Sequence, residues 1–126
     1  MISPAAVHGI IFFAHGSRDP LWRQSIEAVA TYARQLEPRA LVRCAYLELS
    51  DPTLPSCVAD LATAGAQSIT VVPMFLGVGK HAREDLPVLI SQLRASYPKI
   101  DLILQIAIGE DMRLIELMAK IGLSRT

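Results

Sequence analysis

The chain has 126 residues, a length typical of one compact domain, and we expect residues 1–126 to form a single domain. Its 12 basic residues balance 12 acidic ones, which argues against nucleic-acid binding, because that function needs a basic surplus. No apolar run approaches the roughly 18 residues of a membrane span. The first residues lack the basic start and cleavage site of a signal peptide. We therefore expect a cytoplasmic protein with no membrane partner.

Short apolar runs alternate with longer stretches of helical periodicity along the chain. In chain order, the predicted elements are a strand at 9–14, a helix at 20–37, a strand at 40–49, a helix at 50–65, a strand at 67–74, a helix at 82–97, a strand at 100–108 and a helix at 110–122. The continuous apolar run at 9–14 is typical of a strand that is buried on both faces. This order predicts an α/β fold, a mostly parallel four-stranded sheet with helices on both faces.

Polar side chains that favour caps precede the predicted helices. Asp19 is expected to cap the first helix, with Pro20 as its first residue. Ser50 or Asp51 is expected to cap the second. In the third, Pro87 belongs in the first turn of a helix, which makes Asp85 the expected cap.

The residues that follow the strands suggest where a ligand binds. In an open α/β sheet, ligands bind at the carboxyl ends of the strands. His15 follows the first strand, Glu48 lies at the end of the second, and His81 lies in the loop after the third. Glu48 comes 33 residues after His15, and His81 comes 33 residues after Glu48, so one strand–helix unit separates each from the next. All three are therefore expected at one edge of the sheet, in a pocket walled by Met74 and Phe75.

Two imidazoles and a carboxylate at one edge form a candidate metal site. Neutral imidazole binds divalent iron, cobalt, nickel and zinc. Glu48 can serve as a third ligand or as a proton acceptor, or it can cap the helix that follows it. Taken alone, a histidine at the end of a strand is more often a structural or solvated residue than a metal ligand.

Cationic residues lie near these three. Arg18, Lys80 and Arg83, together with the hydroxyl of Ser17, are candidates for binding carboxylates or phosphates. The alternative is a basic edge that is simply solvated. Cys44 and Cys57 are not spaced as a metal-binding pair and are expected to be reduced, buried thiols.

Three stretches, "AHGSRDP", "AYLELSDPTLP" and "VVPMFLGVGKHAREDLP", resemble the class II tetrapyrrole chelatases. These are the cobalt, iron or nickel chelatases that act on sirohydrochlorin or a near relative, and the resemblance is to their short, single-repeat form. It extends from about residue 9 to residue 109 in order and spacing. The third stretch is the most specific of the three, and the C-terminal helix carries little signature.

The resemblance implies a chelatase-like three-layer domain that inserts Co²⁺, Fe²⁺ or Ni²⁺ into sirohydrochlorin, for cobalamin or sirohaem synthesis. It implies that His15 and His81 hold the incoming metal ion, with Glu48 nearby in metal or proton handling. Sirohydrochlorin is a polycarboxylate, so the cationic residues would have anionic partners. The metal is a substrate, and no permanently bound cofactor is expected. Longer relatives carry two such domains facing each other, so a chain with one is expected to work as a homodimer.

Two other functions fit the same residues. A metal or tetrapyrrole carrier would use the same ligands without turnover. A phosphate-transfer enzyme would use His15 as its nucleophile, although Ala14 stands where the phosphohistidine enzymes have an arginine.

Overall fold

The computed structural model describes residues 6–125 of the chain. All eight predicted helices and strands are present, with a short 3-10 helix added before the last one. Their bounds are β1 His8–Ala14, α1 Gln24–Leu36, β2 Leu41–Tyr46, α2 Leu54–Thr63, β3 Ser68–Pro73, α3 Lys80–Ser96, β4 Asp101–Leu104, η1 Ile108–Glu110 and α4 Met112–Leu123.

The four strands form one parallel sheet in the order β2-β1-β3-β4. The predicted α/β fold is confirmed, and the sheet is parallel throughout. β3 lies in its interior, and each of its six residues is buried. This explains why it carries no charged residue, because helices or neighbouring strands cover it.

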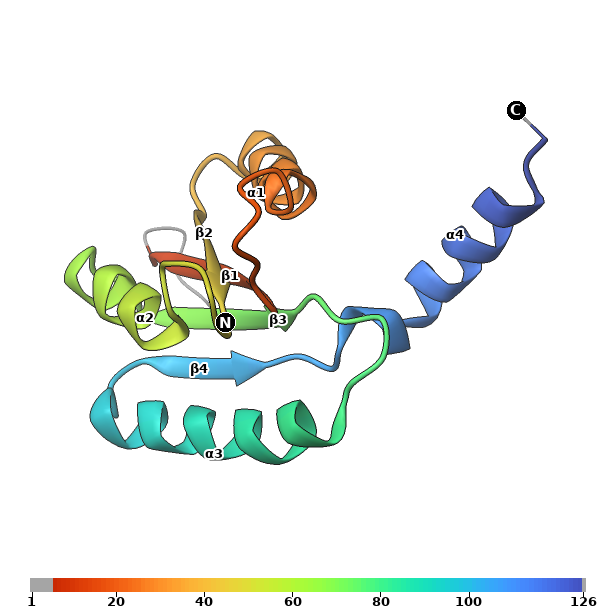
Figure 1. The fold of residues 1–126 in the computed structure, drawn as a ribbon. Helices are drawn as coiled ribbons and strands as arrows, with labels where there is room; N and C mark the ends of the chain where they lie inside the picture. Colours follow the sequence, from red (N-terminus) through yellow and green to blue (C-terminus); the bar gives the residue numbers. More distant parts are fainter. Residues whose placement is uncertain (1–5, 126) are drawn as a thin grey trace.

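Helices cover both faces of the sheet, with α1 on one face and α3 on the other (Figure 1). The larger core lies on the face of α2 and α3. It packs side chains of β1 and β3, including Ile11 and Ile69, against Leu61 of α2 and Ile90 of α3. On the opposite face, α1 buries Ala30 alone among its thirteen residues. The two faces of the sheet are therefore covered unequally.

The first two helices begin later than predicted. The Asp19 carboxylate accepts the amide of Leu21 at 2.9 Å, so it stabilises a turn that precedes α1 and does not cap the helix. In α2 the cap is Thr53, whose hydroxyl accepts the amide of Ser56 at 3.2 Å. The prediction of Ser50 or Asp51 was wrong, because Leu47–Ser50 form a loop after β2.

The third helix begins earlier than predicted. α3 starts at Lys80 with Gly79 as its N-cap, and Pro87 lies inside the helix. The cap prediction for Asp85 was therefore wrong. A proline in a helix removes one backbone hydrogen bond, and burial of Leu86 and Ile90 on either side of Pro87 offsets that cost. His81 is consequently held in the first turn of a helix.

The last helix, α4, extends away from the body beyond the carboxyl ends of β3 and β4 (Figure 1). Asp111 caps it by accepting the amide of Arg113 at 2.9 Å. None of its residues is buried. Among the described helices, α4 included, there is none with the length and apolar character needed to cross a bilayer.

Candidate functional site at the carboxyl edge of the sheet

His15 is the first residue after β1, and its side chain is exposed. Its ring packs against Phe75, with 4.4 Å between the ring centroids. Phe75 is buried and makes an edge-to-face contact with Phe13, whose centroid lies 6.0 Å away. A buried aromatic pair thus supports one side of an imidazole whose edge remains open to solvent.

Glu48 is joined to His15 through the backbone. Its amide donates to the His15 carbonyl at 2.9 Å, and the amide of Leu47 donates to the Ala14 carbonyl at 2.8 Å. Gly16 makes this approach possible. It has a φ of +107°, and a Cβ at that position would lie 1.7 Å from the carbonyl oxygen of Glu48. The loop after β1 and the loop after β2 are therefore locked together.

Ser50 strengthens this junction. Its hydroxyl donates to the Ser17 carbonyl at 2.7 Å and accepts the Ser17 amide at 3.2 Å. The Ser17 hydroxyl accepts the amide of Asp19 at 3.0 Å, so it is engaged within its own turn. The role of Ser50 was not predicted, because a partner 33 residues away leaves no local signal in the sequence.

His81 lies in the first turn of α3 and is exposed. It borders a cavity of about 110 Å³ that is also walled by Phe13 and Leu47. Leu47 in turn lines an open hollow of about 560 Å³ that includes Glu48. Both histidines therefore border the Phe13–Phe75 pair, and Glu48 lies in the neighbouring hollow.

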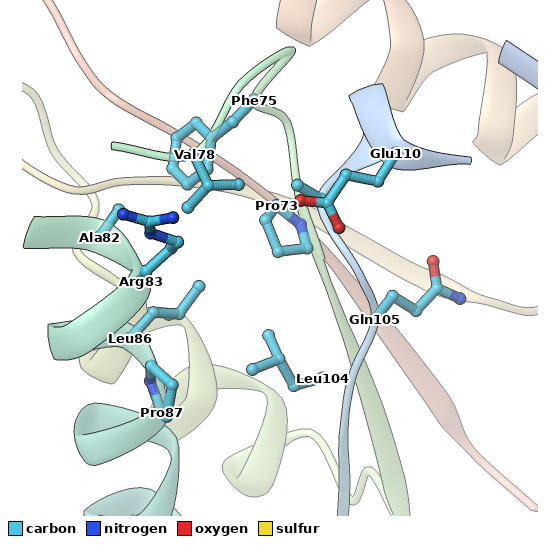
Figure 2. A pocket seen from close by; sticks show the side chains of 11 residues that line it. Pro73, Phe75, Val78, Ala82, Arg83, Leu86, Pro87, Leu104, Gln105 and Glu110 are labelled. Carbon is cyan, nitrogen blue, oxygen red and sulfur yellow. The ribbon is translucent and has the colours of Figure 1, made fainter. Parts of the chain in front are cut away.

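A third cavity, of about 180 Å³, lies between α3 and the segment after β4. Arg83 of α3 and Glu110 of η1 stand on opposite sides of it (Figure 2). Phe75, against which the His15 ring packs, lines this cavity as well.

The predicted cations are free to bind anions. The ion pairs among residues 6–125 are Arg43–Asp60 and Arg113–Asp111, so Arg18, Lys80 and Arg83 have no carboxylate partner in that range. The N-cap Gly79 supplies no side chain to the first amides of α3. The amino end of a helix carries a partial positive charge that favours carboxylates.

The two cysteines are free thiols, as predicted, although Cys44 is only half-buried. Burial raises the pKa of the Cys57 thiol to about 11, and it also raises the pKa of Cys44. Both are therefore protonated near neutral pH, whereas a thiol must lose its proton to bind a metal.

Across residues 6–125 there is no group of three or more His, Cys, Asp or Glu side chains that could hold a metal ion. What the fold brings to one edge is a pair of exposed imidazoles, a nearby carboxylate and unpaired cations. Such an open arrangement suits a metal ion that is held briefly and then transferred, because the remaining coordination positions stay available to its acceptor.

A family model described as CbiX matches residues 9–121. A sirohydrochlorin cobaltochelatase of Methanopyrus kandleri is 36% identical over 78 residues, which cover 62% of this chain and 54% of that protein. The sirohydrochlorin cobaltochelatase of Methanosarcina acetivorans is 35% identical over 83 residues, which cover 66% of this chain and 64% of that protein. The match thus spans less than two thirds of either relative. The sirohydrochlorin cobaltochelatase of Sulfolobus acidocaldarius is 30% identical over 111 residues, which cover 87% of this chain and 85% of that protein.

Solved structures share the fold. A protein from Marinobacter aquaeolei, described as a cobalamin biosynthesis CbiX protein, superposes with a TM-score of 0.77 at 35% identity, covering 94% of this chain and 99% of that one. The sirohydrochlorin chelatase SirB from Bacillus subtilis in complex with cobalt superposes with a TM-score of 0.75 at 25% identity. The superposed region covers 93% of this chain but only 51% of SirB.

Proposed function

Because the chain belongs to the CbiX family, we propose that it inserts a divalent metal ion into sirohydrochlorin. The observation that carries the proposal is the pair of exposed histidines, His15 and His81, bordering one buried aromatic pair at the carboxyl edge of the sheet. Relatives named sirohydrochlorin cobaltochelatase support the choice of substrate.

In this proposal His15 and His81 hold the incoming metal ion. Neutral imidazoles add no negative charge to the ion, so they bind first-row metals and can release them again. Insertion exchanges the metal dication for both pyrrole protons of the macrocycle. Glu48 accepts the two protons one after the other and passes each to water before the next arrives, because its carboxylate is exposed and joined through the backbone to His15.

The substrate is bound through its carboxylates. Arg18, Lys80 and Arg83, with the amino end of α3, supply the positive charge. Ser17 contributes its hydroxyl proton, since the oxygen already accepts the amide of Asp19.

Cobalt is the proposed metal, with Fe²⁺ and Ni²⁺ as alternatives, because the named relatives are cobaltochelatases. The product then enters cobalamin or sirohaem synthesis in the cytoplasm. The metal is a substrate, and no permanent cofactor is part of the proposal.

Residues 1–126 act as one chelatase-like domain, and two copies form the working unit. This part of the proposal is supported by SirB, about half of which matches the chain. A broad macrocycle needs a wall on each side, and a second copy supplies the second wall.

The test uses the purified protein at a small fraction of the sirohydrochlorin concentration. The absorbance change on insertion is followed with Co²⁺, Fe²⁺ and Ni²⁺ separately, against the same mixtures without protein. Many turnovers per protein with at least one metal are expected. Tight binding of metal or tetrapyrrole with no turnover would make the protein a carrier.

A further inference from the structure

The sheet has two edge strands, β2 and β4, and an arginine from the preceding helix binds the backbone of each. The guanidinium of Arg34, in the last turn of α1, donates through Nη2 to the carbonyl of Val42 in β2 at 2.9 Å. Arg94, in the last turn of α3, donates to the carbonyl of Leu102 in β4 through Nε at 3.1 Å and through Nη2 at 2.9 Å. Both arginine side chains are exposed, so neither is needed to fill the core.

The two carbonyls that they bind point away from the sheet. Successive residues of a strand direct their backbone N–H and C=O groups to alternate sides. In β4 the amide of Asp101 donates toward β3, to the carbonyl of Gln67 at 3.0 Å, so the backbone groups of the next residue face outward. After β2 the amide of Leu47 donates toward β1, to the carbonyl of Ala14 at 2.8 Å, and Val42 lies five positions earlier, on the outer side. An outward row of unpaired backbone groups is a template on which a strand of another chain can pair.

The two arginines belong to one kind of helix-to-strand connection that the chain builds twice. The helices end in similar backbone geometry, with φ −139° and ψ 86° at the C-cap Glu37 of α1, and φ −128° and ψ 64° at the C-cap Tyr97 of α3. Each cap amide donates to the carbonyl four residues earlier at 2.9 Å, and each cap carbonyl accepts the amide three residues later at 3.1 Å. Pro38 and Pro98 follow the caps, midway between each arginine and the carbonyl that it binds. The repeated spacing thus delivers a guanidinium to an outward carbonyl of both edge strands.

The connection that leads into the interior strand β3 is built differently. The helix before it, α2, has no basic residue in its last turn, and its C-cap Ala64 keeps a helical φ of −75° and ψ of −1°. The chain then turns through Gly65 at a φ of +90°, and the amide of Ala66 donates to the Leu61 carbonyl at 2.9 Å. Both sides of β3 pair with neighbouring strands. In the described sheet, the arginine therefore accompanies the two strands that have an open side and not the strand between neighbours.

We propose that Arg34 and Arg94 protect the edges of the sheet against the addition of an extended strand from another chain. An incoming strand pairs by donating its amides to the outward carbonyls, and a guanidinium already occupies one such carbonyl on each edge. A hydrogen bond from a charged donor is about twice as strong as one from a neutral donor. A new strand would also have to bury or displace the positive charge, which is a known way of protecting an edge strand.

The two edges are not protected to the same extent. On the outer side of β2, Arg43 is a second donor to the Val42 carbonyl at 3.1 Å, and the carbonyl of Cys44 accepts the Cys57 thiol at 3.5 Å. On β4, the side-chain hydrogen bonds to the strand backbone among the described residues both come from Arg94. The β4 edge therefore depends more on its arginine than the β2 edge does.

The test is self-assembly of Arg34→Met, Arg94→Met and the double variant below their unfolding temperatures. It is followed by thioflavin T fluorescence and by the infrared band of intermolecular sheet. The matched control combines Arg39→Met with Lys99→Met, which removes the same two charges from exposed side chains, one residue after each proline. The double variant is expected to assemble at least about tenfold faster than the control, because a hydrogen bond to a charged group is worth about that factor or more. Arg94→Met is expected to assemble faster than Arg34→Met. Equal rates for the double variant and the control would overturn the proposal.

A second measurement separates an unprotected edge from a loss of stability. Ile90→Val shortens a buried core side chain and leaves both edges unchanged. The double variant and Ile90→Val are compared at the urea concentrations that give them equal free energies of unfolding. The double variant is expected to assemble, and Ile90→Val is expected to stay in solution. Equal assembly at equal stability would make unfolding the cause and would overturn the proposal. Neither measurement needs metal or tetrapyrrole, so the outcome is independent of the chelatase function.

Discussion

Replacing Gly16 with alanine should destabilise the protein and displace the candidate site at the same time. The residue has a φ of +107°, and the new Cβ would lie 1.7 Å from the Glu48 carbonyl oxygen. Backbone strain at such a position costs on the order of 1–3 kcal/mol. The loops must also separate, which weakens the hydrogen bond from the Glu48 amide to His15, worth about 1 kcal/mol. We expect a loss of about 2 to 4 kcal/mol in the free energy of unfolding.

The assay is urea unfolding followed by circular dichroism and by the fluorescence of Trp22, the single tryptophan of the chain. The matched control is Gly77→Ala in the loop after β3, where an added Cβ meets no atom within 4 Å and φ is not positive. That variant should unfold within about 0.5 kcal/mol of the unmodified protein. A Gly16→Ala variant as stable as Gly77→Ala would show that the contact between the two loops does not exist as described.

Four further outcomes are expected. Glu48→Gln should slow insertion more than it weakens metal binding, and an equal loss of both would identify Glu48 as a ligand. Arg83→Ala should raise the KM for sirohydrochlorin more than it lowers kcat, because Arg83 lines a cavity beside the histidine support; an unchanged KM would remove it from substrate binding. Cobalt retention, measured by equilibrium dialysis, should fall on acidification because a protonated imidazole cannot bind metal; equal retention at pH 5 and 8 would argue against histidine ligation. The free energy of unfolding should fall as pH rises from about 9 towards 11, since burial raises the pKa of Cys57 from 9.0 to about 11 and the unfolded chain releases that proton first. Urea unfolding at pH 8 and 10.5 checks this, and a Cys57→Ala variant with the same fall would exclude Cys57 as a cause.

The sheet was predictable because short apolar runs alternate with stretches of helical periodicity along the chain. The run Ser68–Pro73 carries no charged side chain, and its six residues are all buried. The position of the candidate site followed from the same topology, because parallel strands place His15 and Glu48 at one edge. The backbone link between these two residues bears out that part of the prediction.

The helix starts were less predictable, because tertiary packing outweighs local rules there. Pro87 would normally mark a first turn, yet burial of Leu86 and Ile90 keeps it inside α3. Thr53 caps α2 in place of Ser50, whose hydroxyl binds Ser17 instead. Such a long-range partner cannot be inferred from spacing.

The surroundings of the site were predicted in part. Phe75 does line a cavity at this edge, and it is also the residue on which His15 rests. Met74, its neighbour, lines a hollow beside α4 instead. The helical periodicity of the last segment predicted α4 itself, but periodicity does not show whether the apolar side meets the chain's own core or another molecule.

The measurement that tests the central claim most directly is cobalt insertion into sirohydrochlorin under multiple turnover by the unmodified protein, His15→Ala and His81→Ala. Both side chains are exposed, so each variant should retain the fold and the thermal stability of the unmodified protein. We expect the unmodified protein to turn over and each variant to lose at least about nine tenths of the rate. Near-native turnover in either folded variant would contradict the assignment of the two histidines as the residues that hold the incoming metal.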